Sequence, residues 1–160
     1  IIKDIVRDAK NSSRNVRLSL DSQGAKRGNS SVLDYKIKLF MKKLKERNDF
    51  DRVKFVILFG SQAEGRANKM SDYDFAVYYG GDNRERFDFR ISFGGILPDN
   101  FDLQIFQDLP LYVRKEVLKG KVVYAEDMRF VYDVAYETIK AFGDFKKYYY
   151  DYLDRRPIVI

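Results

Sequence analysis

The spacing of hydrophobic residues changes several times along the chain, and each change predicts a new element. From Ser31 the apolar side chains recur every three or four positions, which predicts an amphipathic helix that runs to about Arg47. Later segments are almost continuously apolar, as in a strand covered on both faces, or alternate between apolar and polar residues, as in a half-exposed strand. Four such segments predict strands, at residues 52 to 59, 72 to 79, 101 to 106 and 122 to 124.

Helical segments separate and follow the predicted strands. Shorter helices are expected at residues 61 to 69, 84 to 91 and 110 to 118, the last of which is stopped by Gly120. A long closing helix is expected at residues 127 to 154, with one inward apolar face. That face consists of Val131, Val134, Ala135, Thr138, Phe142, Phe145, Tyr149 and Tyr152. Helices that alternate with strands in this order indicate an α/β (α+β) fold, in which helices flank a small mixed β-sheet.

The first thirty residues differ from the rest in composition. Residues 1 to 10 place apolar side chains at helical spacing, and residues 11 to 30 are mostly polar. The thirty residues carry seven Lys or Arg and three Asp, a net charge of +4 out of the +6 of the chain, so the rest of the chain carries only +2. We therefore expect a basic N-terminal arm (1–30), one domain (31–156) and a short tail (157–160).

Two residue types are missing, which narrows the possible chemistry. The chain has no cysteine and no histidine, and this excludes disulfides, thiolate nucleophiles, Ser-His-Asp triads and zinc sites of the usual kind. A catalytic metal would have to bind oxygen ligands, which suit Mg²⁺ or, as a second choice, Mn²⁺. Because no apolar run approaches the roughly 20 residues that span a bilayer, we expect a soluble, cytoplasmic protein with no membrane contact.

Gly60 and Ser61 stand where a predicted buried strand ends and a short helix begins. Glycine lets the backbone approach a ligand closely, and the free N–H groups of the following helix point towards it. This arrangement is typical of a phosphate-binding loop, in which Gln62 and Arg66 are the nearest side chains that can reach a β- or γ-phosphate. Taken alone, the same residues could form an ordinary turn capped by Ser61.

Three aspartates lie on the next two predicted strands. Asp72 and Asp74 are two positions apart, so their side chains leave one face of the strand with Cα atoms roughly 6.5 Å apart. On the following strand Asp102 and Gln104 share the polar face. If the two strands are neighbours, three carboxylates meet and can hold divalent cations. Each aspartate, taken singly, also fits a plain solvated position on a strand.

Together these residues resemble the signature of the DNA polymerase β-like nucleotidyltransferases, which is Gly-Ser, ten residues, then Asp-x-Asp. Here Gly60 and Ser61 are followed by residues 62 to 71 and then by Asp72 and Asp74. The resemblance implies a nucleotidyltransferase (polymerase β palm-like) fold. The residues that it assigns to catalysis and metal binding are Asp72, Asp74 and Asp102, and those that it assigns to the nucleotide are Gly60, Ser61, Gln62 and Arg66.

Within that superfamily, a chain this short resembles the minimal nucleotidyltransferases, which are antitoxins whose toxin is a small helical HEPN-type ribonuclease. The resemblance covers about residues 31 to 155 and implies Mg²⁺ (or Mn²⁺), ATP or another nucleoside triphosphate, and a helical HEPN-type partner. The expected reaction transfers a nucleoside monophosphate, AMP from ATP, to a hydroxyl of that partner, because the chain has no further domain to hold an acceptor. A homo-oligomer is compatible with this interpretation.

Two alternatives stay open. Relatives carry arginine directly after Gly-Ser and again two positions later, where this chain has Gln62 and Glu64. The chain could therefore be an inactive antitoxin-type protein that neutralises its partner by complex formation alone. The basic arm could also bind nucleic acid, but a charge-rich arm is more often simply solvated, and nucleic acid is not the partner that we expect.

Overall fold

The computed structural model describes residues 29–63 and 72–155, with side chains from residue 31 to 63 and from 72 to 148. The expected arm, apart from its last two residues, and the expected tail therefore lie outside the described residues. In chain order the elements are α2 (Asn29–Lys45), η1 (Phe50–Arg52), β1 (Val53–Phe59), β2 (Tyr73–Tyr79), α3 (Asn83–Gly94), β3 (Phe101–Ile105), η2 (Phe106–Asp108), α4 (Leu111–Val117), β4 (Lys121–Ala125) and α5 (Met128–Arg155).

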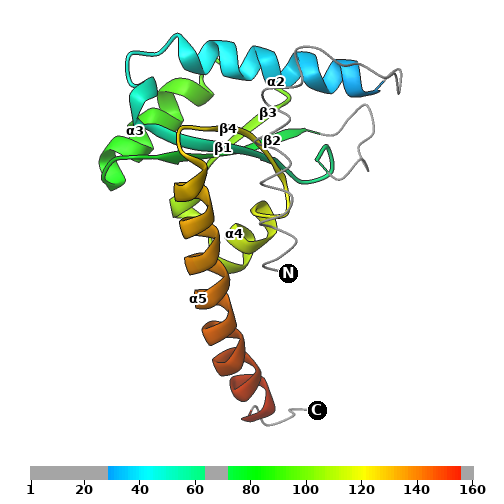
Figure 1. Ribbon diagram of the computed structural model, residues 1–160, viewed down its shortest axis with the longest axis vertical. Helices are drawn as coiled ribbons and strands as arrows, with labels where there is room; N and C mark the ends of the chain where they lie inside the picture. Colours follow the sequence, from blue (N-terminus) through cyan, green and yellow to red (C-terminus); the bar gives the residue numbers. More distant parts are fainter. Residues whose placement is uncertain (1–28, 64–71, 156–160) are drawn as a thin grey trace.

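The four strands form one mixed sheet, as the sequence predicts, and the structure shows their order to be β3-β2-β1-β4 (Figure 1). β1 is antiparallel to both β2 and β4, whereas β2 and β3 run parallel. Two parallel strands need a crossover connection, and α3 supplies it. β1 lies in the centre and sends Val56 and Leu58 into one core and Phe55 and Ile57 into the other. Its continuous apolar run is thus explained by cover on both faces.

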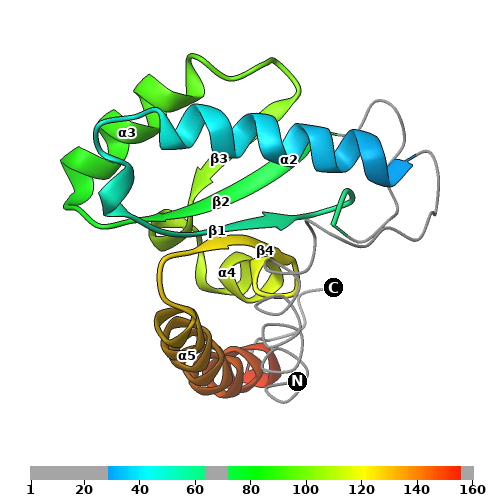
Figure 2. The ribbon, with the colours of Figure 1, turned by 45° about the horizontal axis from the view of Figure 1, so that its top comes forward.

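Helices cover both faces of the sheet, which makes three layers (Figure 2). On one face α2 and α3 pack over the sheet, and the Phe40 ring of α2 stacks on Phe75 of β2 with ring centroids 3.9 Å apart. On the other face Val117 of α4 and Val131 of α5 pack against the sheet. The helices α2 and α3 on one side and α4 and α5 on the other therefore fix which way each strand side chain points.

The alternation on β2 is less simple than the sequence suggests. Tyr73, Phe75 and Val77, which by alternation point away from the face of the aspartates, are buried in the first core. Ala76, which by alternation shares the face of the aspartates, is fully buried in the second core. The cause is the second layer of helices, which covers the middle of this face. Asp74 and Tyr78, on either side of Ala76 on this face, are only half-buried.

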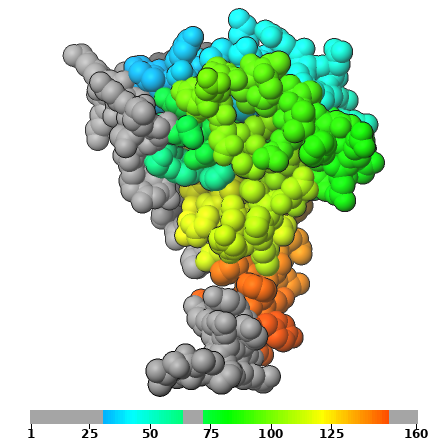
Figure 3. Space-filling view, turned by 180° about the vertical axis from the view of Figure 1, so that it is seen from behind, coloured from blue at the N-terminus to red at the C-terminus, as the bar shows by residue number. Residues whose placement is uncertain are grey.

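Helix α5 differs most from expectation. Val131, Ala135 and Thr138 are buried, with 3%, 3% and 4% of their surface exposed. The helix then continues past the sheet, and the body narrows towards this projecting half (Figures 1 and 3). Phe145 is 50% exposed there, so the prediction of an inward face along the whole helix is wrong at this position. The side chains of Tyr149 and Tyr152 lie outside the described residues.

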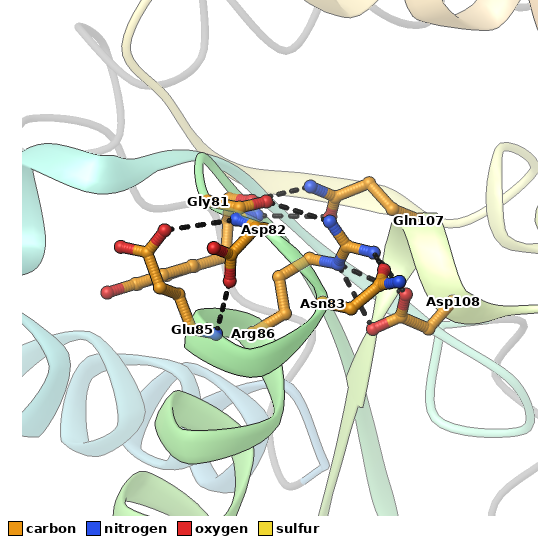
Figure 4. Close-up of polar contacts among 8 residues, drawn as sticks. Gly81, Asp82, Asn83, Glu85, Arg86, Gln107 and Asp108 are labelled. Atoms are coloured by element: carbon orange, nitrogen blue, oxygen red, sulfur yellow. Dashed lines mark hydrogen bonds and ion pairs between the residues drawn. The ribbon is translucent and has the colours of Figure 1, made fainter.

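The end of the β2–β3 pair away from Asp74 is closed by a polar network (Figure 4). The Arg86 guanidinium donates to Asp108, with an Nη2–Oδ1 distance of 2.9 Å, and to the Gly81 carbonyl at 2.7 Å. The Gln107 side chain accepts from the Tyr79 backbone N–H at 3.1 Å and donates to the Tyr79 carbonyl at 2.5 Å. These contacts tie α3, the end of β2 and η2 together, and they help to fix the register of β2 against β3.

Among the helices that the structure describes, none is both long enough and apolar enough to cross a membrane.

Candidate functional site

Pairing of β2 with β3 places two of the predicted aspartates side by side. Asp74 lies directly opposite Asp102 in the parallel register. The Asn100 carbonyl accepts the Tyr73 N–H at 2.8 Å, which ties the start of β2 to the start of β3. Both carboxylates lie on the sheet face opposite Phe75 and its core, so the stacking of that ring holds Asp74 in the outward orientation. The structure thus brings together two residues that are 28 positions apart in the sequence.

Asp72 stands slightly apart from this pair. The strand begins at Tyr73, so the expected start of the strand at Asp72 is one residue too early. Asp72 is exposed, but its negative charge still contributes to raising the pKa of Asp74. Among the side chains that the structure describes, at residues 31–63 and 72–148, no three acidic groups lie close enough together to hold one metal ion. Convergence of all three aspartates, as the sequence suggests, would therefore require Asp72 to turn towards the pair.

Gly60 closes the site from the β1 side. Phe59 pairs with Asp74 in the antiparallel register, and Gly60 follows with φ +76°, a backbone conformation that favours glycine. A Cβ atom at Gly60 would lie 2.6 Å from Oδ2 of Asp74. The glycine predicted for a phosphate loop is thus also required by the aspartate opposite, because any side chain there would displace the carboxylate.

The surroundings of Asp74 disfavour its charged form. Burial, followed by the negative charges of Asp102 and Asp72 and a hydrogen bond with Asp102, raises the pKa of Asp74 to about 6. Two carboxylates with no cation between them repel each other, and a divalent cation would relieve that repulsion. The donor set of carboxylate oxygens, without sulfur or nitrogen ligands, fits Mg²⁺ or Mn²⁺.

Gln104 is the nearest side chain along β3 on the same face. Its Nε2 donates to both carboxylate oxygens of Asp102, at 3.2 Å each. The alternation of the strand places Gln104 beside Asp102, but the sequence does not show that the amide turns towards the carboxylate. That contact depends on the neighbour across the sheet, Ala76, whose side chain offers no hydrogen-bonding group.

The predicted nucleotide-binding residues are only partly described. Ser61 and Gln62 lie in a turn that covers residues 61 to 63 and directly follows Gly60. Arg66 and most of the short helix expected at residues 61 to 69 lie outside the described residues. The turn adjoins the pair of carboxylates, which is where a triphosphate would have to lie to share a cation with them.

A separate open cleft of about 540 Å³ lies on the carboxylate face of the sheet, at the end of β2 away from Asp74. Tyr78 of β2, Phe106 of η2 and Thr138 of α5 contribute to its lining. Tyr78 shares the face of Asp74 by alternation along β2, but the buried Ala76 lies between them, and neither Asp74 nor Asp102 lines the cleft.

Comparison with known families gives one match. The family described as polymerase beta, nucleotidyltransferase matches residues 36–129, which is more than half of the chain. The matched stretch includes the turn at Gly60 and all three aspartates. No curated protein matches the chain.

Several solved structures share the fold. A chain of a toxin–antitoxin crystal structure with AMP-PNP is 20% identical, with a TM-score of 0.59, and the match covers 74% of this chain and 95% of that one. A chain of the MntA–HepT toxin–antitoxin structure is 18% identical, with a TM-score of 0.57 and coverage of 76% and 96%. A structure of a tri-AMPylated Shewanella oneidensis HEPN toxin in complex with an MNT antitoxin matches with 18% identity, a TM-score of 0.57 and coverage of 76% and 95%. At this level of identity the likeness shows the fold.

Proposed function

The chain belongs to the polymerase beta nucleotidyltransferase family, and from this premise we propose that it transfers a nucleoside monophosphate, AMP from ATP, to a hydroxyl group of a partner protein. The observation that carries the proposal is the pair of carboxylates, Asp74 opposite Asp102, beside the tight turn at Gly60. In the reaction the acceptor oxygen forms a bond to the α-phosphorus, and the bond from that phosphorus to the departing pyrophosphate breaks.

We assign a role to each residue, and Asp72 must turn towards the other two aspartates to fill its role. Asp72 and Asp74 would hold the cation that the triphosphate shares, and Asp102 would complete the metal site and help to deprotonate the acceptor hydroxyl. The turn of Gly60 and Ser61 would hold the departing pyrophosphate through backbone N–H groups. When bound, Mg²⁺ or Mn²⁺ neutralises the charge that develops on the phosphoryl oxygens. Positioning and charge supply most of the acceleration in such reactions, so no histidine or cysteine is needed.

We further propose a helical HEPN-type toxin as the acceptor and the chain as its antitoxin. Support comes from the shared fold with chains of toxin–antitoxin structures, one of which contains a tri-AMPylated HEPN toxin.

The test measures label transfer from α-³²P-ATP to a helical HEPN-type protein as the candidate partner, with Mg²⁺ present. Asp74→Asn and Asp102→Asn should each reduce transfer by about a thousandfold or more, because each removes a charged ligand while leaving the shape unchanged. The matched control is Asp88→Asn, the same change at an exposed ion pair on α3. If either site variant transfers label at the rate of the control, the proposed site is wrong.

The rival function is an antitoxin that acts by complex formation alone. It is favoured by the exposed position of Asp72 before the strand and by the lack of a group of three acidic side chains in the described part of the chain. Calorimetry with ATP separates the two functions. An enzyme should bind ATP only when Mg²⁺ is present, whereas a binding protein should show no nucleotide binding under either condition.

A further inference from the structure

The Asp102 carboxylate has one hydrogen-bond donor that is built into its own strand. Gln104 stands two positions further on β3, so its side chain leaves the same face as Asp102. The amide is partly buried and lies at 3.2 Å from each of the two carboxylate oxygens. Only the amide nitrogen can face a carboxylate in this way, since the amide oxygen would be repelled.

The neighbours of Gln104 explain why its amide turns to Asp102. On the neighbouring strand β2, Gln104 is paired with Ala76, which is fully buried and has no polar side-chain atom. The flanking residues Leu103 and Ile105 point into the opposite core. Along this face of the β2–β3 pair, the carboxylate of Asp102 is therefore the acceptor that the strand register offers to the amide.

We propose that Gln104 is a positioning residue for the metal site: it holds the Asp102 carboxylate in the rotamer that faces Asp74. The inference rests on the function proposed above, since it concerns the same pair of carboxylates. A neutral amide suits this role, because each carboxylate oxygen has a second lone pair and can still bind a cation. Removing a group that orients a metal-binding side chain through a hydrogen bond commonly lowers metal affinity or activity by about 10- to 100-fold.

Gln104→Met tests the proposal, because methionine has a similar length and no donor. The matched control is Gln107→Met, the same substitution three positions along the chain, where the amide bonds to the Tyr79 backbone. The probe is AMP-PNP, a triphosphate analogue that requires no acceptor protein. Its binding is measured by calorimetry over a range of Mg²⁺ concentrations, and the melting temperature of each variant is measured in EDTA.

A positioning role predicts that Gln104→Met raises the Mg²⁺ concentration needed for half-maximal AMP-PNP binding by about tenfold or more, with little change in melting temperature. Gln107→Met should do the opposite, with a lower melting temperature and an unchanged Mg²⁺ requirement. If the wild-type protein binds AMP-PNP with Mg²⁺ and Gln104→Met needs no more Mg²⁺ than the wild type, the positioning role is overturned while the proposed function stands. If the wild-type protein itself shows no binding that depends on Mg²⁺, the proposed function fails first.

Discussion

The two ends of the β2–β3 pair differ in whether their charged side chains are paired with opposite charges. At one end Arg86 neutralises Asp108 and also caps the Gly81 carbonyl, so the charged groups there are paired (Figure 4). At the other end Asp74 and Asp102 face each other as like charges, and the pKa of Asp74 is raised to about 6. The first end gains stability from its polar contacts, whereas the second leaves charge uncompensated. Such a cost is expected where a cation or substrate completes the arrangement.

Among the variants considered, Gly60→Ala should disturb the Asp74–Asp102 pair most strongly. The new Cβ atom would lie 2.6 Å from Asp74 Oδ2 and would sit on a backbone with φ +76°. Asp74 must move, so we expect label transfer to fall by about a hundredfold or more. The measurement is the rate of transfer per folded molecule. Gly94→Ala serves as control, because its Cβ would approach Leu103 Cδ2 no closer than 4.0 Å, and a loss of activity in that variant would show that the effect is not specific to the site.

Removing the Arg86–Asp108 contact at the other end should lower the free energy of unfolding and leave activity unchanged. The Arg86 side chain is 15% exposed and makes charge-assisted hydrogen bonds to Asp108. We expect Arg86→Met to lower the free energy of unfolding by about 2 kcal/mol, measured by urea denaturation. The control is Arg84→Met, whose side chain is 84% exposed in an ion pair on α3 and should change the free energy by less than about 0.5 kcal/mol. Equal effects of the two variants would contradict a special role for the network.

The uncompensated charge predicts a dependence of stability on pH. The pKa of Asp74 is about 6 in the folded protein, whereas an aspartate in an unfolded chain titrates near ~3.9. The folded state thus binds more protons between these values, and the free energy of unfolding should fall as the pH rises from about 4 to about 6. Without metal at pH 7.5, Asp74→Asn should be more stable than the wild type by about 1 kcal/mol, after allowance for solvent screening.

Chemical denaturation in EDTA at pH 4.5 and pH 7.5 checks this sign. The gain from Asp74→Asn should shrink at the lower pH, where Asp74 of the wild type is mostly protonated and neutral. If the wild-type protein is more stable than Asp74→Asn at pH 7.5, repulsion between the Asp74 and Asp102 carboxylates does not destabilise the metal-free fold.

A smaller effect is expected far from both ends. Gly143 lies inside α5, and a Cβ atom there would meet nothing within 4 Å. Because glycine weakens a helix interior, Gly143→Ala should raise the free energy of unfolding by about 0.5 to 1 kcal/mol and leave label transfer unchanged. Thermal unfolding measures the first effect and the transfer assay the second. No gain in stability would indicate that the projecting half of α5 does not contribute to cooperative unfolding.

Much of the chemistry could be predicted from local sequence. The apolar run of β1, the turn at Gly60 and the alternation around Asp102 each predict their element and its face, because hydrophobic periodicity reflects burial directly. The missing histidine and cysteine restrict any metal site to oxygen ligands. The spacing of Gly-Ser and Asp-x-Asp is enough to suggest the family that the comparison with known families then finds.

The tertiary structure decided which of these residues meet. The parallel register, set by packing on both faces of the sheet and by contacts at each end of the strand pair, places Asp102 opposite Asp74 and leaves Asp72 just before the strand. The second helical layer buries Ala76 and so leaves Gln104 to bond with Asp102. The sequence also did not predict that α5 projects beyond the sheet. An amphipathic pattern indicates that one face of a helix is apolar, but it does not show whether residues of the same chain cover that face. Contacts between residues distant in the chain depend on register and packing, which local periodicity does not encode.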